Sequence, residues 1–117
     1  MMLDFQNPEH AVDADAARRL TEDRAAQIID VREEYEHDAG HIPGDMYLDM
    51  QHVALKTDVL GRDRPVIFYC RGGIRSGMAT EAFRAAGWEA YNLHGGLLAW
   101  VEAGQPLKPT DGIVADH

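Results

Sequence analysis

Short apolar runs with no regular polar alternation recur along this chain, and segments of helical character separate them. The runs predict strands over residues 27–32, 65–70 and 88–93, and a turn leading into a short strand over 41–50. Strands that are apolar on both faces are typical of a parallel sheet, because crossover helices then cover both of its faces. The sequence therefore predicts an α/β fold with a central parallel sheet flanked by helices on both faces.

Helices are predicted between these strands over residues 11–26, 33–40, 75–87 and 95–104. We expect Asp13 to cap the first of them, because its short side chain can accept a hydrogen bond from the first turn. The apolar side of the third helix is predicted to consist of Met78, Ala82, Phe83 and Ala86. The strands and helices together predict one compact domain.

Length and composition limit what else the chain can be. Its 117 residues suit a single domain, which we place at 10–104, between an N-terminal arm over 1–9 and a polar C-terminal tail over 105–117. The tail is expected either to pack through Ile113 and Val114 or to stay loose. The chain has one cysteine, so its fold needs no oxidising compartment. No apolar stretch is long enough to cross a bilayer, and the expected location is the cytoplasm.

The charge of the chain excludes some classes of partner. With 20 acidic and 11 basic residues, the net charge is −9. A surface this acidic repels nucleic acids and anionic membranes, so we expect neither as a partner.

The single cysteine lies where the apolar run 65–70 ends, and the loop that follows it is rich in hydrogen-bond donors. Gly72 and Gly73 allow the sharp turn from strand to helix, and they let the main chain approach a bound atom closely. The start of the next helix adds N–H groups and the positive end of its dipole, and Arg71 and Arg75 add charge. We therefore expect the Cys70 thiol to ionise more easily than a free cysteine and to act as a nucleophile. The alternative is an inert thiol buried at a strand end.

The loop "CRGGIRS" after the strand "VIFY" resembles the active-site loop of single-domain rhodaneses, a family of sulfurtransferases. Two further segments resemble signatures of that family, "IIDVREEYEHDAGHIPGD" and "GWEAYNLHGGLLAW". The three segments follow in the expected order from Ile28 to Trp100. This resemblance implies a rhodanese-like fold with five parallel strands.

The resemblance also implies a chemistry. Cys70 would take the outer sulfur of a donor such as thiosulfate as a persulfide, and a thiol acceptor, a protein thiol among the candidates, or cyanide would then remove it. The N–H groups of the loop would hold the sulfur, and the side chains of Arg71 and Arg75 would orient the donor. The implied substrate-binding residues are Arg71, Gly72, Gly73, Ile74, Arg75 and Ser76. No metal or organic cofactor is implied.

Two alternatives come from relatives with the same fold. Cell-cycle-type phosphatases and some arsenate reductases need a longer loop between cysteine and arginine than the four residues between Cys70 and Arg75, so phosphatase activity is not expected. The other alternative is a non-catalytic regulatory or docking module. Retention of the cysteine in a complete loop argues against it.

For the remaining residues of the signature segments we expect mainly structural roles. Asp30 and Arg32 are expected to form an ion pair, with each other or with Glu33 or Glu34, or to support the active loop from a neighbouring strand end. His41 is expected to hydrogen-bond within its turn, and His94 to lie in a turn near the site. His37 and His41 have a spacing that metals use on helices, but Gly40 ends that helix, so the sequence predicts no metal site.

One segment departs from the family pattern. After His-Ile-Pro-Gly, Asp45 and Tyr47 stand where relatives often have Ala and Asn. We expect this change to affect the local turn and the rim of the pocket, without touching the Cys70 loop.

Overall fold

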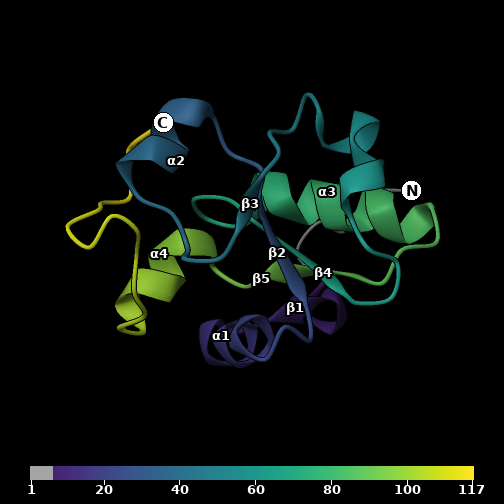
Figure 1. The fold of residues 1–117 in the computed structure, drawn as a ribbon, viewed down its shortest axis with the longest axis horizontal. Helices are drawn as coiled ribbons and strands as arrows, with labels where there is room; N and C mark the ends of the chain where they lie inside the picture. The colour runs from purple at the N-terminus through teal and green to yellow at the C-terminus, as the bar shows by residue number, and fades with distance from the viewer. Residues whose placement is uncertain (1–6) are drawn as a thin grey trace.

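Five parallel strands form one sheet in the computed structural model, which describes residues 7–117 (Figure 1). The predictions for residues 1–6 lie outside this range. The strand order is β1-β5-β4-β2-β3, with each pair parallel, so the predicted architecture is confirmed. The strands are β1 Ala11–Val12, β2 Gln27–Asp30, β3 Met46–Tyr47, β4 Val66–Tyr69 and β5 Ala90–Leu93.

Helices cover both faces of this sheet. The α-helices are α1 Ala14–Glu22, α2 Glu34–Ala39, α3 Ile74–Ala85 and α4 Gly96–Glu102, and the short 3₁₀ helices are η1 Pro8–His10, η2 Val53–Leu55 and η3 Thr57–Val59. In Figure 1, α1 and α4 lie on one side of the sheet and α3 lies on the other. No helix within residues 7–117 combines the length and the apolar character that crossing a membrane requires.

Neighbouring residues on the central strands enter two separate cores. Ile28 and Ile67 are register partners and pack with α1 and α4, whereas Ile29 and Phe68 are partners and pack with α3. All eight residues of β2 and β4 are buried. Burial on both faces explains why these strands are predicted by continuous runs of apolar residues.

The start of the chain differs from the prediction. Asp13 does cap the first helix, because its side chain accepts a hydrogen bond from Ala16 N–H at 2.8 Å. Ala11 and Val12, however, form β1 and pair with Asn92 and Leu93. The partner strand is distant in sequence, so the local pattern could not reveal it.

The buried side of α3 also differs from the prediction. Of the four residues expected there, only Phe83 is buried, and it lies against Phe68 and Trp88. The other buried residues of α3 are Ser76, Gly77, Ala79 and Thr80. Polar Ser76 and Thr80 are tolerated because their hydroxyls donate within the protein, to Asn92 and to the Ser76 carbonyl respectively.

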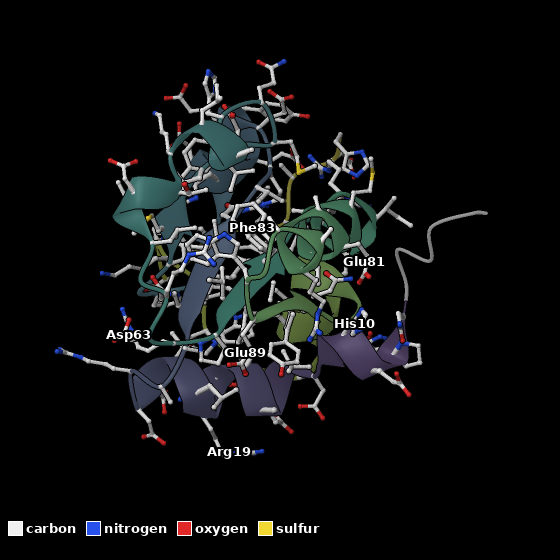
Figure 2. The ribbon with its side chains drawn as sticks, turned by 90° about the vertical axis from the view of Figure 1, so that its right-hand side faces the viewer. His10, Arg19, Asp63, Glu81, Phe83 and Glu89 are labelled. Atoms are coloured by element: carbon white, nitrogen blue, oxygen red, sulfur yellow. The ribbon has the colours of Figure 1, made fainter. Side chains whose placement is uncertain are left out.

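The two ends of the described chain pack on this frame. Near the start, the His10 ring lies 2.7 Å from a carboxylate oxygen of Glu81 on α3 (Figure 2). In the tail, Val114 packs on the core shared by α1 and α4, whereas Ile113 is exposed and uses its N–H to bond Ala39 O.

Candidate active site

Cys70 directly follows β4, and its side chain is buried at the first turn of α3. Of the N–H groups expected around its sulfur, that of Gly73 donates to Sγ at 3.1 Å and that of Ser76 lies 3.5 Å from it. Gly73 has φ +107°, a left-handed conformation that favours glycine, so this residue aims the loop as the sequence predicts. A Cβ added at Gly72 would meet no atom of the described residues within 4 Å, so Gly72 is not sterically required.

Ser76 and Asn92 complete the surroundings of the sulfur. Ser76 Oγ lies 3.3 Å from Cys70 Sγ and 2.6 Å from Asn92 Oδ1. A hydroxyl has one hydrogen, and the shorter contact assigns it to Asn92. The Asn92 amide in turn donates to Gly73 O at 3.0 Å. The sulfur therefore lies in a closed network that ties α3, β5 and the loop together.

The N-terminus of α4 holds the carbonyl side of the same loop. Leu97 N–H donates to Cys70 O at 2.9 Å, and Leu98 N–H donates to Arg71 O at 3.1 Å. Gly96, at φ +62°, makes this approach possible, because a Cβ there would lie 2.5 Å from Arg71 O. The Gly95-Gly96 pair after His94 is thus a docking point for the loop. The His94 side chain is exposed, whereas the main-chain N–H of His94 donates to Val12 O.

Both arginines of the loop pair with carboxylates. Arg75 forms two hydrogen bonds with Glu36, at 2.8 and 3.0 Å, and the Glu36 side chain is fully buried. Arg71 pairs more loosely with Asp116, at 3.1 Å, and that carboxylate is 98 % exposed. The positive charge expected near the sulfur is present, and it is partly compensated by these acids.

Glu36 links the loop to the neighbouring strand end. Burial opposes its charge, but hydrogen bonds from Arg75 and from Glu33 N–H lower the pKa of Glu36 below its usual value. Nearby, Arg32 and Asp30 form the predicted ion pair at 2.8 Å, with both side chains fully buried. Arg32 also donates to Gly40 O at 2.7 Å, so the pair fixes the end of α2.

An open cavity of about 560 Å³ gives access to the sulfur. It is lined by Glu33, Tyr35, Cys70, Arg71, Gly72, Ile74, Arg75 and His117. Ile74, expected as a substrate-binding residue, begins α3 and has a side chain 62 % exposed. The cavity therefore combines guanidinium groups with exposed apolar surface.

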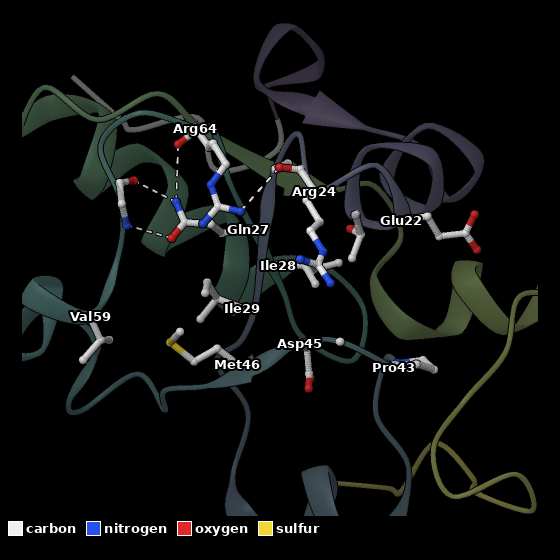
Figure 3. Close-up of a pocket in the computed structure, with 14 residues that line it drawn as sticks. Glu22, Arg24, Gln27, Ile28, Ile29, Pro43, Asp45, Met46, Val59 and Arg64 are labelled. Carbon is white, nitrogen blue, oxygen red and sulfur yellow. Dashed lines mark hydrogen bonds between the residues drawn. The ribbon is translucent and has the colours of Figure 1, made fainter.

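A larger cavity, of about 640 Å³, lies beside β2 and β3 instead (Figure 3). Two of its residues pair with each other: the Gln27 amide donates to Gly61 O, and Gly61 N–H donates to Gln27 Oε1, both at 2.7 Å. The only cysteine of the chain lines the smaller cavity. Chemistry rather than size therefore identifies the candidate active site.

Sequence reasoning missed two residues of this site. Asn92 has a detectable signal, because a buried amide within an apolar strand calls for a specific partner. Glu36 has a weaker one: it is one of four acidic residues in the segment 33–38, and only its capping-box spacing to Glu33 distinguishes it.

Comparison with known proteins places this geometry among related chains. The family model described as the rhodanese-like domain matches residues 13–103. A sulfurtransferase of Allochromatium vinosum is 31 % identical over 97 residues, covering 82 % of this chain and 91 % of that protein. The uncharacterized protein YqhL of Bacillus subtilis is 40 % identical over 78 residues, which cover 66 % of this chain and 62 % of its own length.

Solved structures agree with these matches. The rhodanese-related protein of Thermoplasma volcanium aligns with a TM-score of 0.76 at 26 % identity, covering 84 % of this chain and 96 % of that one.

Proposed function

The chain belongs to the rhodanese-like domain family, and from this premise we propose that it is a sulfurtransferase in which Cys70 carries the transferred sulfur as a persulfide. The observation that carries the proposal is the convergence of the Gly73 and Ser76 N–H groups on Cys70 Sγ. Donors held in this way stabilise negative charge on sulfur, both in the thiolate and in the persulfide anion.

The reaction is a double displacement. The Cys70 thiolate attacks the outer sulfur of thiosulfate, a new S–S bond forms, and the original S–S bond breaks with its electron pair leaving on sulfite. An acceptor thiolate, or cyanide, then attacks the outer sulfur of the persulfide and regenerates the Cys70 thiolate. No net oxidant or reductant is needed, and no proton is required when both thiols react as thiolates.

The arginines would orient the donor unequally. Arg75 is held by two hydrogen bonds to buried Glu36, so it supplies a fixed charge. Arg71 pairs with the exposed carboxylate of Asp116, and its Nε donates to Ala115 O at 3.2 Å, so an anionic donor can replace that carboxylate. We assign Arg71 the direct contact with a sulfonate group and Arg75 the positioning of the loop. Asp30 and Arg32 support the loop through the strand end next to it. The reaction is proposed for the cytoplasm, where acceptor thiols are kept reduced.

Intact mass measurement of the reduced protein tests this function. We expect brief thiosulfate treatment to add one sulfur atom to the wild type and none to Cys70→Ser, and cyanide to remove it as thiocyanate. If thiosulfate fails, mercaptopyruvate and an organic persulfide test other donor classes. Failure of all three donors to load Cys70 would contradict the proposal and favour a binding module with a silent cysteine.

A further inference from the structure

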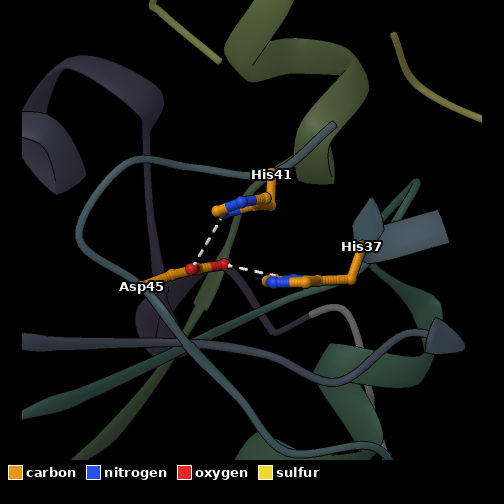
Figure 4. A group of neighbouring side chains, drawn as sticks. All are labelled: His37, His41 and Asp45. Carbon is orange, nitrogen blue, oxygen red and sulfur yellow. Dashed lines mark hydrogen bonds and ion pairs between the residues drawn. The ribbon is translucent and has the colours of Figure 1, made fainter. Parts of the chain in front are cut away.

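Two histidines and an aspartate converge at the turn between α2 and β3, outside the Cys70 cavity (Figure 4). His41 Nδ1 lies 3.1 Å from Asp45 Oδ1, and His37 Nδ1 lies 3.7 Å from Asp45 Oδ2. The two imidazole rings are stacked, with centroids 4.0 Å apart and planes at 19°. In Figure 4 both rings present their nitrogen edge to the same carboxylate.

From this juxtaposition we propose that His37, His41 and Asp45 form a binding site for a divalent transition ion of the zinc type. One ligand atom from each residue lies within 4.8 Å of the others. Bonds of zinc to nitrogen and oxygen of about 2.0 to 2.2 Å in a tetrahedron require ligand atoms about 3.3 to 3.6 Å apart. Each imidazole lies near this range from one oxygen of the Asp45 carboxylate, His41 Nδ1 at 3.1 Å from Oδ1 and His37 Nδ1 at 3.7 Å from Oδ2. Binding of one ion requires the two rings, whose planes are now 19° apart, to rotate so that a nitrogen of each points at the same place.

The charges around the cluster favour a cation. Asp45 and Asp30 both contact the imidazoles, while Arg32 pairs with Asp30, so with neutral rings one negative charge stays uncompensated. The side chain of Asp45 is only 3 % exposed. A bound cation would relieve the cost of burying a carboxylate.

The surroundings hold the ligands in place. Tyr69 OH donates to Asp45 Oδ2 at 2.6 Å, which orients the carboxylate from the strand that leads to Cys70. Tyr47 packs against the His37 ring at 4.8 Å. The His37 ring also contacts Asp30, with Nδ1 2.8 Å from the carboxylate, which in a neutral ring places the hydrogen on Nδ1. Binding of an ion at Nδ1 therefore requires this nitrogen to lose that hydrogen and to turn from Asp30 to the metal. The hydrogen then moves to Nε2, the other tautomer of a neutral imidazole.

The donor set selects the kind of ion. Two imidazole nitrogens with one carboxylate suit zinc and its neighbours in the first transition row, whereas magnesium prefers oxygen ligands. Three protein ligands leave the fourth tetrahedral position for water. The sequence argued against a metal here because Gly40 ends the helix, but the turn after it returns Asp45 to the two rings.

Calorimetric titration of the tag-free protein with zinc tests this site. A thiolate also binds zinc, so the titration is run on the wild type and on Cys70→Ser. We expect both proteins to bind one equivalent at this site, magnesium to give no signal, and Asp45→Asn and His41→Ala each to weaken zinc binding about tenfold or more. His52→Ala is the matched control, because His52 also pairs with an aspartate, Asp49 at 2.6 Å, but has no second histidine beside it.

Three outcomes would overturn the proposal. They are loss of the site in Cys70→Ser, full binding in either Asp45→Asn or His41→Ala, and loss of binding in His52→Ala. Zinc X-ray absorption on Cys70→Ser gives an answer that does not depend on how the cluster variants fold. Two imidazole ligands are expected there, and a spectrum without imidazole would exclude the site. Because the site lies apart from Cys70, failure here leaves the persulfide test unaffected.

Discussion

The turns after β4 and β2 lie side by side and use different chemistry. Tyr69 and Asp30, the last residues of these strands, are register partners. After β4, main-chain N–H groups converge on the sulfur of Cys70. After β2, charged side chains pair with one another, as Arg32 does with Asp30. The first turn therefore depends on backbone conformation and the second on individual side chains, so different substitutions should disrupt each.

The largest loss of stability and activity is expected from a change at Gly96, where the N-terminus of α4 contacts the main chain of the Cys70 loop. Gly96→Ala would place a Cβ 2.5 Å from Arg71 O at φ +62°, and should lower the free energy of unfolding by about 3 kcal/mol or more and abolish persulfide formation. Gly104→Ala is the control, because Gly104 also has positive φ, +79°, but faces open space. Gly104→Ala should lower the free energy of unfolding by only about 1 kcal/mol. Denaturant unfolding of both variants measures the difference, and equal losses would mean that α4 does not clamp the loop.

The side-chain pair that joins α2, after β2, to the Cys70 loop should respond to loss of one charge. Glu36→Gln leaves Arg75 with a poorer partner and should lower the free energy of unfolding by about 2 kcal/mol at pH 7. In Glu22→Gln the broken pair, with Arg18, is exposed, and the change should stay within about 0.5 kcal/mol.

The same variant carries a pH prediction. Because the folded protein lowers the pKa of Glu36 below 4.5, this carboxylate stabilises the fold fully above that pH, and the stabilisation is lost as the pH falls through the folded-state pKa. The difference in unfolding free energy between wild type and Glu36→Gln should therefore narrow below pH 4.5. If the difference in unfolding free energy between the two proteins stayed constant from pH 3 to pH 7, ionisation of Glu36 would not be the source of this pH dependence.

A smaller effect is expected from Ser76, which approaches the Cys70 sulfur with both its main-chain N–H and its side-chain hydroxyl. Ser76→Ala removes the hydroxyl that donates to Asn92 beside the sulfur. The network around Cys70 then loses one hydrogen bond, and sulfur transfer should slow about tenfold. Thr80→Val removes another buried hydroxyl of α3, which donates to the Ser76 carbonyl at 2.8 Å, and should lower stability without slowing transfer. Transfer rates from single-turnover loading separate the two. Equal rates in both variants would deny Ser76 a role at the sulfur.

The smallest effect should come from the exposed partner of Arg71. Asp116→Asn frees the guanidinium for an anionic donor and should lower the KM for thiosulfate by less than about fivefold, the range of an exposed ion pair. Asp111→Asn, another exposed acid of the tail, should leave the KM unchanged. A raised KM in Asp116→Asn would show that the tail helps donor binding instead of competing with it.

A structural feature of this protein can be predicted from the sequence when the residues that determine it lie close together in the chain. The central strands, the cap at Asp13 and the turn at Gly73 were predictable, because apolar runs, a capping side chain and a glycine each act within a few residues. The strand at Val12 was not, since its partner Leu93 is distant in the chain. The buried side of α3 was mispredicted, because Ser76 and Thr80 are satisfied by partners that composition cannot show.

In the site, the same distinction holds. Cys70 and its loop stand out in the sequence, but the pairing of Arg75 with Glu36 crosses 39 positions, and that of Ser76 with Asn92 crosses 16. In the sequence, Asp45 stands out only as a departure from a family pattern. Its closeness to His37 and His41 depends on the conformation of the turn, which cannot be read from the amino-acid sequence alone.

The shortness of the outer strands bears on how the protein behaves at high concentration. β1 and β3, the two edges of the sheet, are each two residues long. An edge strand offers unpaired main-chain groups on which a strand of another molecule can assemble, and short edges restrict that assembly. The four-residue strands β2 and β4, both fully buried, are shielded between their neighbours. Edge-to-edge aggregation of the native protein is therefore disfavoured, and the segments prone to it are exposed only on unfolding.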